Sequence, residues 1–94
     1  EPTMHLDVRF QFEVMRLVRR LAREGRAVII VSHDMELTAR YCDRFLLLHE
    51  GRTHAVGGFG NVLTHANIRA VFGVNAHVED AANPEDRMIR IRPC

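Results

Sequence analysis

Two side chains in this sequence are of the types that help water attack a substrate. Glu1 carries a carboxylate, and His33 carries an imidazole inside the triplet Ser32-His33-Asp34. A carboxylate at the end of a buried strand can orient and polarise a water molecule. A histidine at a strand tip can donate a hydrogen bond to developing negative charge, and losing such a donor typically costs about a hundredfold in rate. Glu1 and His33 are therefore candidate catalytic residues.

Each candidate also has a simpler interpretation. Glu1 is a terminal residue that needs no fixed structure, and a histidine after a strand, taken alone, is more often structural than catalytic. Asp7 is at minimum a helix cap, because its side chain can accept a backbone N–H at the start of a helix. The other histidines lack metal-ligand spacing within one element, so surface positions are expected for them.

The elements that would position these residues can be read from the hydrophobic pattern. Apolar residues recur every three or four positions over residues 7–23, which predicts an amphipathic helix with Asp7 as its cap and Gly25 as its stop. Residues 27–31 form a continuous β-branched run, as is typical of a strand covered on both faces in a parallel sheet. His33 would then lie where open α/β sheets place their ligand sites.

The rest of the chain alternates short helical and strand-like segments, which favours an α/β fold. Asp34 can cap a short helix that runs to about Tyr41, and Thr64 and Gly73 bracket a later one. The expected elements are a hairpin of residues 44–48 and 53–56, helical segments near 61–63 and over 65–72, and a second hairpin of residues 74–78 and 88–91.

Composition excludes several classes of function. The 94 residues carry a net charge of +1, which is no footprint for nucleic acid or an anionic membrane. Five arginines gather between residues 16 and 26, where a solvated helix face is the favoured interpretation and a nucleic-acid contact the lesser one. No apolar run is long enough to span a bilayer. The two cysteines show no disulfide or zinc spacing, which fits a reducing cytosol.

Three motifs, in order around an amphipathic helix and a strand-forming run, resemble the second half of an ATP-binding-cassette (ABC) ATPase: Glu1-Pro2-Thr3, Leu6-Asp7 and Val31-Ser32-His33-Asp34. The resemblance makes Glu1 the residue after the Walker B aspartate, residues 4–7 the D-loop, and His33 the switch histidine of the H-loop. Residues 57–63 and 67–74 are most similar to importer ATPases for iron–siderophore, haem or cobalamin.

This resemblance implies an α/β fold: the C-terminal part of a P-loop NTPase (RecA-like) core with parallel strands, flanking helices and a C-terminal β-hairpin. Residues 1–94 would be the C-terminal part of a nucleotide-binding domain, and residues 74–94 a small strand pair within it. The phosphate loop, Q-loop, signature motif and Walker B aspartate are absent, and all thirteen basic residues are Arg, so there is no P-loop lysine. We therefore expect no bound cofactor and no activity of these residues alone.

The resemblance also implies roles and partners for the parent protein, an ATPase that uses ATP and Mg²⁺. Glu1 and His33 would be catalytic, His33 would contact the nucleotide, and Leu6 and Asp7 would couple two subunits. No residue is assigned as a metal ligand. A second ATPase copy and a membrane permease would be partners, at the cytoplasmic face of the cell membrane.

The strand expected at residues 27–31 would lack some of its neighbours in these 94 residues, so its edges would be exposed. We therefore expect the 94 residues alone to self-associate. Two other functions stay open. One is a translation-associated cassette ATPase, and the other is a non-enzymatic oligomerising or regulatory module.

Overall fold

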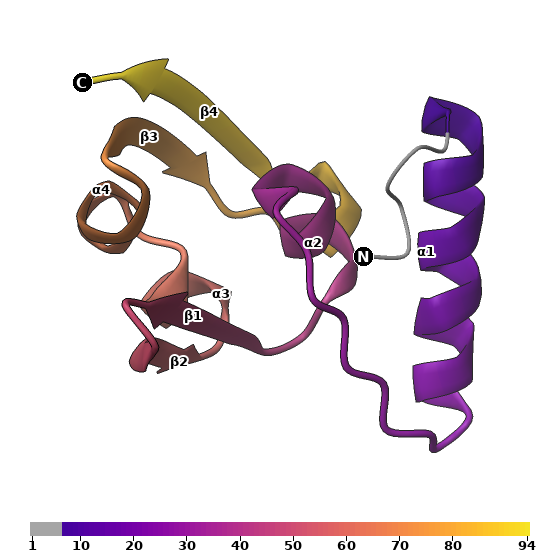
Figure 1. Ribbon diagram of the computed structural model, residues 1–94. Coiled ribbons are helices and arrows are strands. Elements are labelled where there is room, and N and C mark those ends of the chain that lie inside the picture. The colour runs from indigo at the N-terminus through magenta and orange to yellow at the C-terminus, as the bar shows by residue number, and fades with distance from the viewer. Residues whose placement is uncertain (1–6) are drawn as a thin grey trace.

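The computed structural model describes residues 7–94, so Asp7 and His33 are included, whereas Glu1 and Leu6 lie outside the described residues. The fold is mixed α/β, with short helices and two small antiparallel sheets of two strands each (Figure 1). In chain order the elements are α1 (Val8–Arg23), α2 (Met35–Tyr41), β1 (Phe45–His49), β2 (Arg52–Gly57), α3 (Phe59–Val62), α4 (His65–Phe72), β3 (Val74–Glu79), the 3₁₀-helix η1 (Pro84–Asp86) and β4 (Met88–Pro93).

The helix predicted over residues 7–23 is present as α1, with the predicted cap. The Asp7 carboxylate accepts a hydrogen bond from the Phe10 amide at 3.0 Å, which satisfies one of the free N–H groups of the first turn. Gly25 takes a φ of 91° just beyond the helix, a conformation that glycine adopts without a Cβ clash. The apolar face is less buried than predicted: Met15 is buried, but Val8 and Phe10 are more than half exposed.

The strand predicted at residues 27–31 is not formed in the described structure. These residues have no regular secondary structure and lie outside both sheets of the described chain. Ile29 and Val31 are 91% and 76% exposed, and only Ile30 packs inward. A buried strand needs hydrogen-bonded neighbours, and both described sheets are formed by later segments of the chain, so the parallel strand at residues 27–31 stays a prediction.

Both predicted hairpins are present, and both are antiparallel. β1 and β2 are joined by Glu50 and Gly51, which have φ values of 52° and 75°; two successive positive φ values suit the tight turn that matches strand twist. The parallel strands expected from the resemblance are not among the described elements, since each sheet contains one hairpin only.

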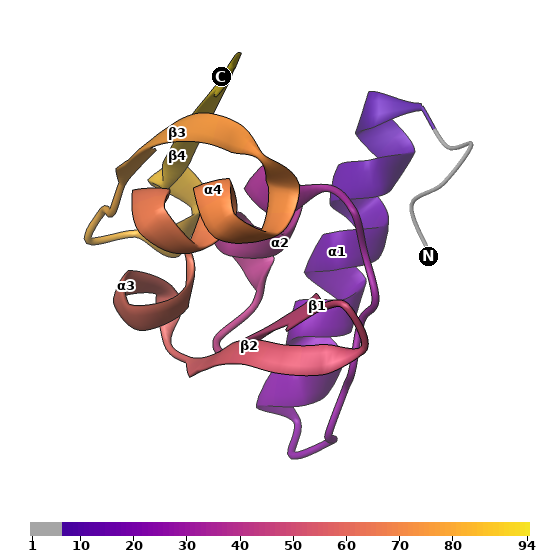
Figure 2. The same cartoon turned by 60° about the vertical axis from the view of Figure 1, so that its left-hand side comes forward.

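Two apolar clusters hold the structure together, and α2 contributes to both. The larger one gathers side chains from α2, from both hairpins and from the short helices: Ala39, Phe45, Leu47, Phe59, Val62, Leu63, Ile68, Ala76 and Ile89. The smaller one consists of Met15, Leu37 and Tyr41, and joins α1 to α2. In Figures 1 and 2, α1 accordingly stands to one side, next to α2. α2 therefore provides the apolar contact that attaches α1 to the remainder of the fold.

The C-terminal half follows the predicted pattern closely. α4 begins at the Thr64 cap and ends at Gly73, whose φ of 68° is left-handed. β3 and β4 pair over their full lengths, and Ala76 and Ile89 of this pair belong to the larger core. In the part of the chain that the structure describes, no helix has the length and apolarity needed to cross a membrane.

Candidate functional site

His33 lies at a bend between the exposed residues 27–31 and the first turn of α2. Two local hydrogen bonds fix the backbone around the bend and at the start of α2. The Ser32 hydroxyl oxygen accepts from the Asp34 amide at 3.0 Å, and the Asp34 carboxylate accepts from the Leu37 amide at 3.0 Å. His33 is exposed to solvent.

Of the other sequence-predicted site residues, the structure describes Asp7 alone. Asp7 is exposed at the start of α1, where its carboxylate serves as the helix cap described above. Glu1 and Leu6 lie outside the described residues, so their roles remain predictions, as does the convergence of Glu1 with His33.

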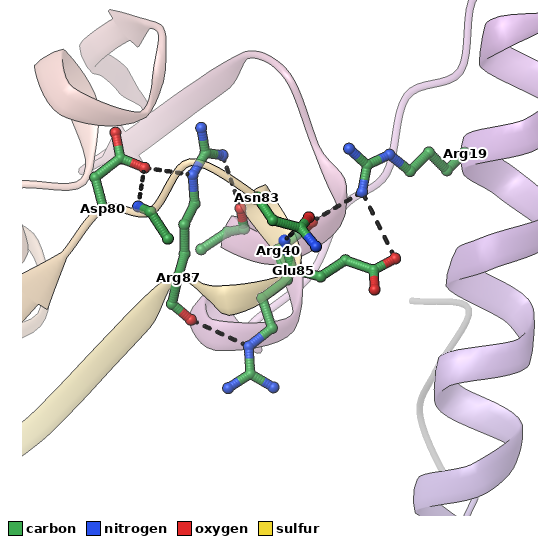
Figure 3. A network of polar contacts seen from close by, with 8 residues as sticks. Arg19, Arg40, Asp80, Asn83, Glu85 and Arg87 are labelled. Atoms are coloured by element: carbon green, nitrogen blue, oxygen red, sulfur yellow. Dashed lines mark hydrogen bonds and ion pairs between the residues drawn. The ribbon is translucent and has the colours of Figure 1, made fainter.

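At the opposite end of α2, two arginine side chains bind the last helical carbonyl groups (Figure 3). Arg87 donates from Nη1 to the Ala39 carbonyl oxygen at 3.0 Å, and Arg19 donates from Nη1 to the Arg40 carbonyl oxygen at 3.4 Å. The carbonyls of a last helical turn have no partner within the helix and carry the negative end of its dipole. The two guanidinium groups therefore cap α2 from segments that are distant in sequence.

Arg87 makes further contacts that fix its orientation. Its Nε donates to the Asp80 carboxylate at 2.9 Å, and its guanidinium carbon lies 4.4 Å from the centre of the Phe59 ring. Its own carbonyl oxygen accepts from Arg40 Nε at 3.1 Å, so a second bond joins the same two segments. The hydrogen bond from Arg87 holds the pKa of Asp80 below its ordinary value, and the bond from the Ala81 amide adds to this. The side chain of Arg87 is only 15% exposed.

Arg19 and Arg87 are the residues that sequence reasoning missed. Arg19 was placed on a solvated face, yet its side chain is 16% exposed and forms an ion pair with Glu85 at 3.8 Å. A usable signal was its spacing of four from Met15, which puts both side chains on the same face of α1. Arg87 had no such signal, because its acceptor Ala39 is 48 positions away.

No candidate metal centre is found within residues 7–94, where three or more His, Cys, Asp or Glu side chains nowhere gather as possible ligands. Of the two cysteines, Cys42 is half-buried and Cys94 exposed. Burial raises the pKa of the Cys42 thiol, and the neighbouring Asp43 carboxylate adds to the rise.

No family model matches the chain, but individual proteins do. A hemin import ATP-binding protein, HmuV, of Pseudomonas putida is 46% identical over 85 residues, which is 90% of this chain and 32% of the relative. HmuV of Bordetella avium is 49% identical over 79 residues, which is 83% of this chain and 30% of the relative. A cobalamin import ATP-binding protein, BtuD, of Halobacterium salinarum is 40% identical over 94 residues, covering 99% of this chain and 23% of the relative.

The chain thus spans about a third or less of the relatives it matches. Nearly all of it, including His33 and the capped ends of α2, falls within the matched stretches of 79–94 residues. The chain is therefore homologous to a C-terminal portion of the ATP-binding subunits of ABC importers.

Proposed function

We propose that the protein containing these residues is the ATP-hydrolysing subunit of an ABC transporter that powers import of a metal chelate. The observation that carries this proposal is the 40–49% identity to hemin and cobalamin import ATP-binding proteins over most of the chain. The exposed imidazole of His33 at the start of α2 fits such an activity, since a histidine there is accessible to a nucleotide.

In this proposal the reaction is the attack of water on the terminal phosphoryl group of ATP. Glu1 orients and polarises the water. His33 donates a hydrogen bond to the γ-phosphate, where negative charge must be stabilised during transfer. Leu6 and Asp7 lie at the contact with a second copy of the subunit, and Asp7 at the same time caps α1.

ATP would be the substrate, and Mg²⁺ would neutralise phosphate charge when bound. The described residues do not supply a ligand set for that ion, so no step through it is assigned to them. The sequence also lacks the phosphate loop with its lysine, the part of such enzymes that holds the nucleotide. We infer that these 94 residues alone neither bind ATP tightly nor hydrolyse it.

The same proposal extends to the fold and the setting of the protein. Residues 27–31 would join a parallel sheet of a P-loop NTPase core, and their exposed apolar side chains support this. The partners would be a second ATPase copy and a membrane permease, with the subunit held at the cytoplasmic face of the membrane. On their own, the 94 residues would associate through the same exposed segment.

Two alternative functions were predicted from the sequence, and each is separated from the leading proposal by a different observation. A translation-associated ATPase is disfavoured because the relatives described above are named as import proteins. A non-enzymatic module is separated from the leading proposal by activity measurements on variants.

The test is the steady-state ATPase rate of the full-length protein with Glu1→Gln or His33→Ala. We expect each substitution to lower kcat by about a hundredfold or more. Matched controls are Glu24→Gln, just after α1, and His54→Ala, on β2, which change exposed residues of the same types outside the site. Wild-type rates in both site variants would overturn the proposal, and absence of activity in the wild-type protein would favour the non-enzymatic module.

A further inference from the structure

We propose that Arg87 is a positioning residue that holds His33 in place through α2. The inference rests on the proposed function, because it assigns to the segment after β3 a role in the same site. It is drawn from one arrangement: α2 carries His33 before its first turn and the acceptor of Arg87 in its last turn.

Helix α2 is too short to be stable without tertiary contacts. It has seven residues, and helices of this length are unstable in water without tertiary contacts. Its N-terminal end is capped locally by the Asp34 carboxylate, and Leu37 in its first half packs against Met15 of α1. The position of α2 is therefore set by its packed side chains and by the contacts at its C-terminal end.

The C-terminal end of α2 is held by side chains from other segments of the chain. The Ala39 carbonyl oxygen accepts from Arg87, and Ala39 itself is fully buried in the larger core. The Arg40 side chain returns a bond to the backbone of Arg87 at 3.1 Å. These two bonds run in opposite directions between α2 and the segment around Arg87 (Figure 3), so displacement of that segment must displace α2.

The Arg87 side chain is fixed by several contacts, so it can set the position of α2. Its guanidinium binds Asp80 on one edge and the Ala39 carbonyl on another, while its face lies over Phe59. A lysine could not satisfy this geometry, because it presents a point charge rather than a planar fork. A shift of α2 by a fraction of its own turn would move His33, which adjoins the helix cap Asp34.

The expected loss of kcat depends on how far His33 is displaced. Displacing a catalytic group by about 1 Å can lower a rate by about a hundredfold. Loss of Arg87 leaves the packed side chains of α2 in place, so the displacement should be smaller. We expect Arg87→Met to lower kcat by about tenfold and to leave the KM for ATP unchanged, since Arg87 would not touch the nucleotide.

The experiment uses the full-length protein with two readouts. The first is ATPase kinetics of wild type, Arg87→Met, His33→Ala and the double variant, with Arg92→Met as the matched control on the exposed part of β4. The second is the NMR signal of the His33 imidazole, which does not require activity. If Arg87 acts through His33, Arg87→Met lowers kcat in the wild-type background only, and it shifts the His33 signal while Arg92→Met does not.

Each other outcome is also decisive. An unchanged His33 signal in Arg87→Met, or an equal loss of kcat with and without His33, would overturn the inference. If the His33 signal shifts but the wild-type protein does not hydrolyse ATP, positioning stands and the proposed function fails. Should Arg87→Met not fold, Asp80→Ala removes only one of the contacts that orient Arg87 and is expected to shift the same signal by a smaller amount.

Discussion

The attachment of α1 can be tested by substituting Met15 with alanine. Met15 is 2% exposed and packs with Leu37 and Tyr41 of α2, and these three residues make up the smaller core cluster. Truncating a fully buried methionine costs about 2–5 kcal/mol, from lost transfer energy and the cavity left behind. Because Met15 belongs to the smaller cluster and not to the larger core, we expect this loss to fall on the docking of α1.

Leu17 provides a matched comparison on the same helix. It is 45% exposed, so Leu17→Ala removes only part of a buried surface and opens no enclosed cavity. Its expected cost is below about 1 kcal/mol. A cost of 2 kcal/mol for Met15→Ala corresponds to about a 30-fold increase in the population in which α1 has left α2.

The assay is amide hydrogen exchange of the full-length protein. In Met15→Ala the amides of α1 should exchange at least about 30-fold faster, while those around Ile68 in the larger core keep their protection. In Leu17→Ala both sets should stay close to wild type. Equal protection of α1 in the two variants, or equal loss of protection in both regions for Met15→Ala, would refute the idea that this cluster is the main support of the helix.

Three further results follow from single residues. Thr64→Ala, which removes the cap of α4, should lower the free energy of unfolding by about 1 kcal/mol in chemical denaturation, whereas Thr53→Ala on exposed β2 should change it little. Because burial raises the pKa of Cys42, iodoacetamide at pH 8 should modify the exposed Cys94 first, as followed by peptide mass spectrometry. The guanidinium hydrogen bond places the folded-state pKa of Asp80 below 3.8, so its contribution to stability is present above about pH 4 and disappears as the pH falls through that lower pKa. Asp80→Asn should therefore flatten the acid limb of the stability curve, and an unchanged limb would contradict this assignment.

Local structure was predictable wherever the signal lay within a few residues. The caps Asp7, Asp34 and Thr64 all accept the expected backbone hydrogen bonds, because a side-chain oxygen at a helix start meets an amide three residues later. Gly73 ends α4 as expected, since it can take the left-handed conformation at no steric cost. The similarity to import ATP-binding proteins was also predictable, because the motif around His33 and its spacing are features of the sequence itself.

Long-range arrangement was not predictable in the same way. Residues 27–31 have the composition of a buried strand but are exposed, since strand formation depends on neighbours rather than on composition. Arg19 has the spacing of a solvated arginine cluster but binds a carbonyl of α2 instead. For Arg19 the deciding partner lies 21 positions away in the chain.

The amino-acid sequence by itself determined the caps of α1, α2 and α4, the two hairpins and the similarity to importer ATPases, because these depend on neighbouring residues and on motif spacing. The tertiary structure alone decided that α2 is held at its C-terminal end by Arg19 and Arg87. The Arg87 bond joins residues 48 positions apart and the Arg19 bond joins residues 21 positions apart, and no local pattern records which carbonyl a distant arginine will meet.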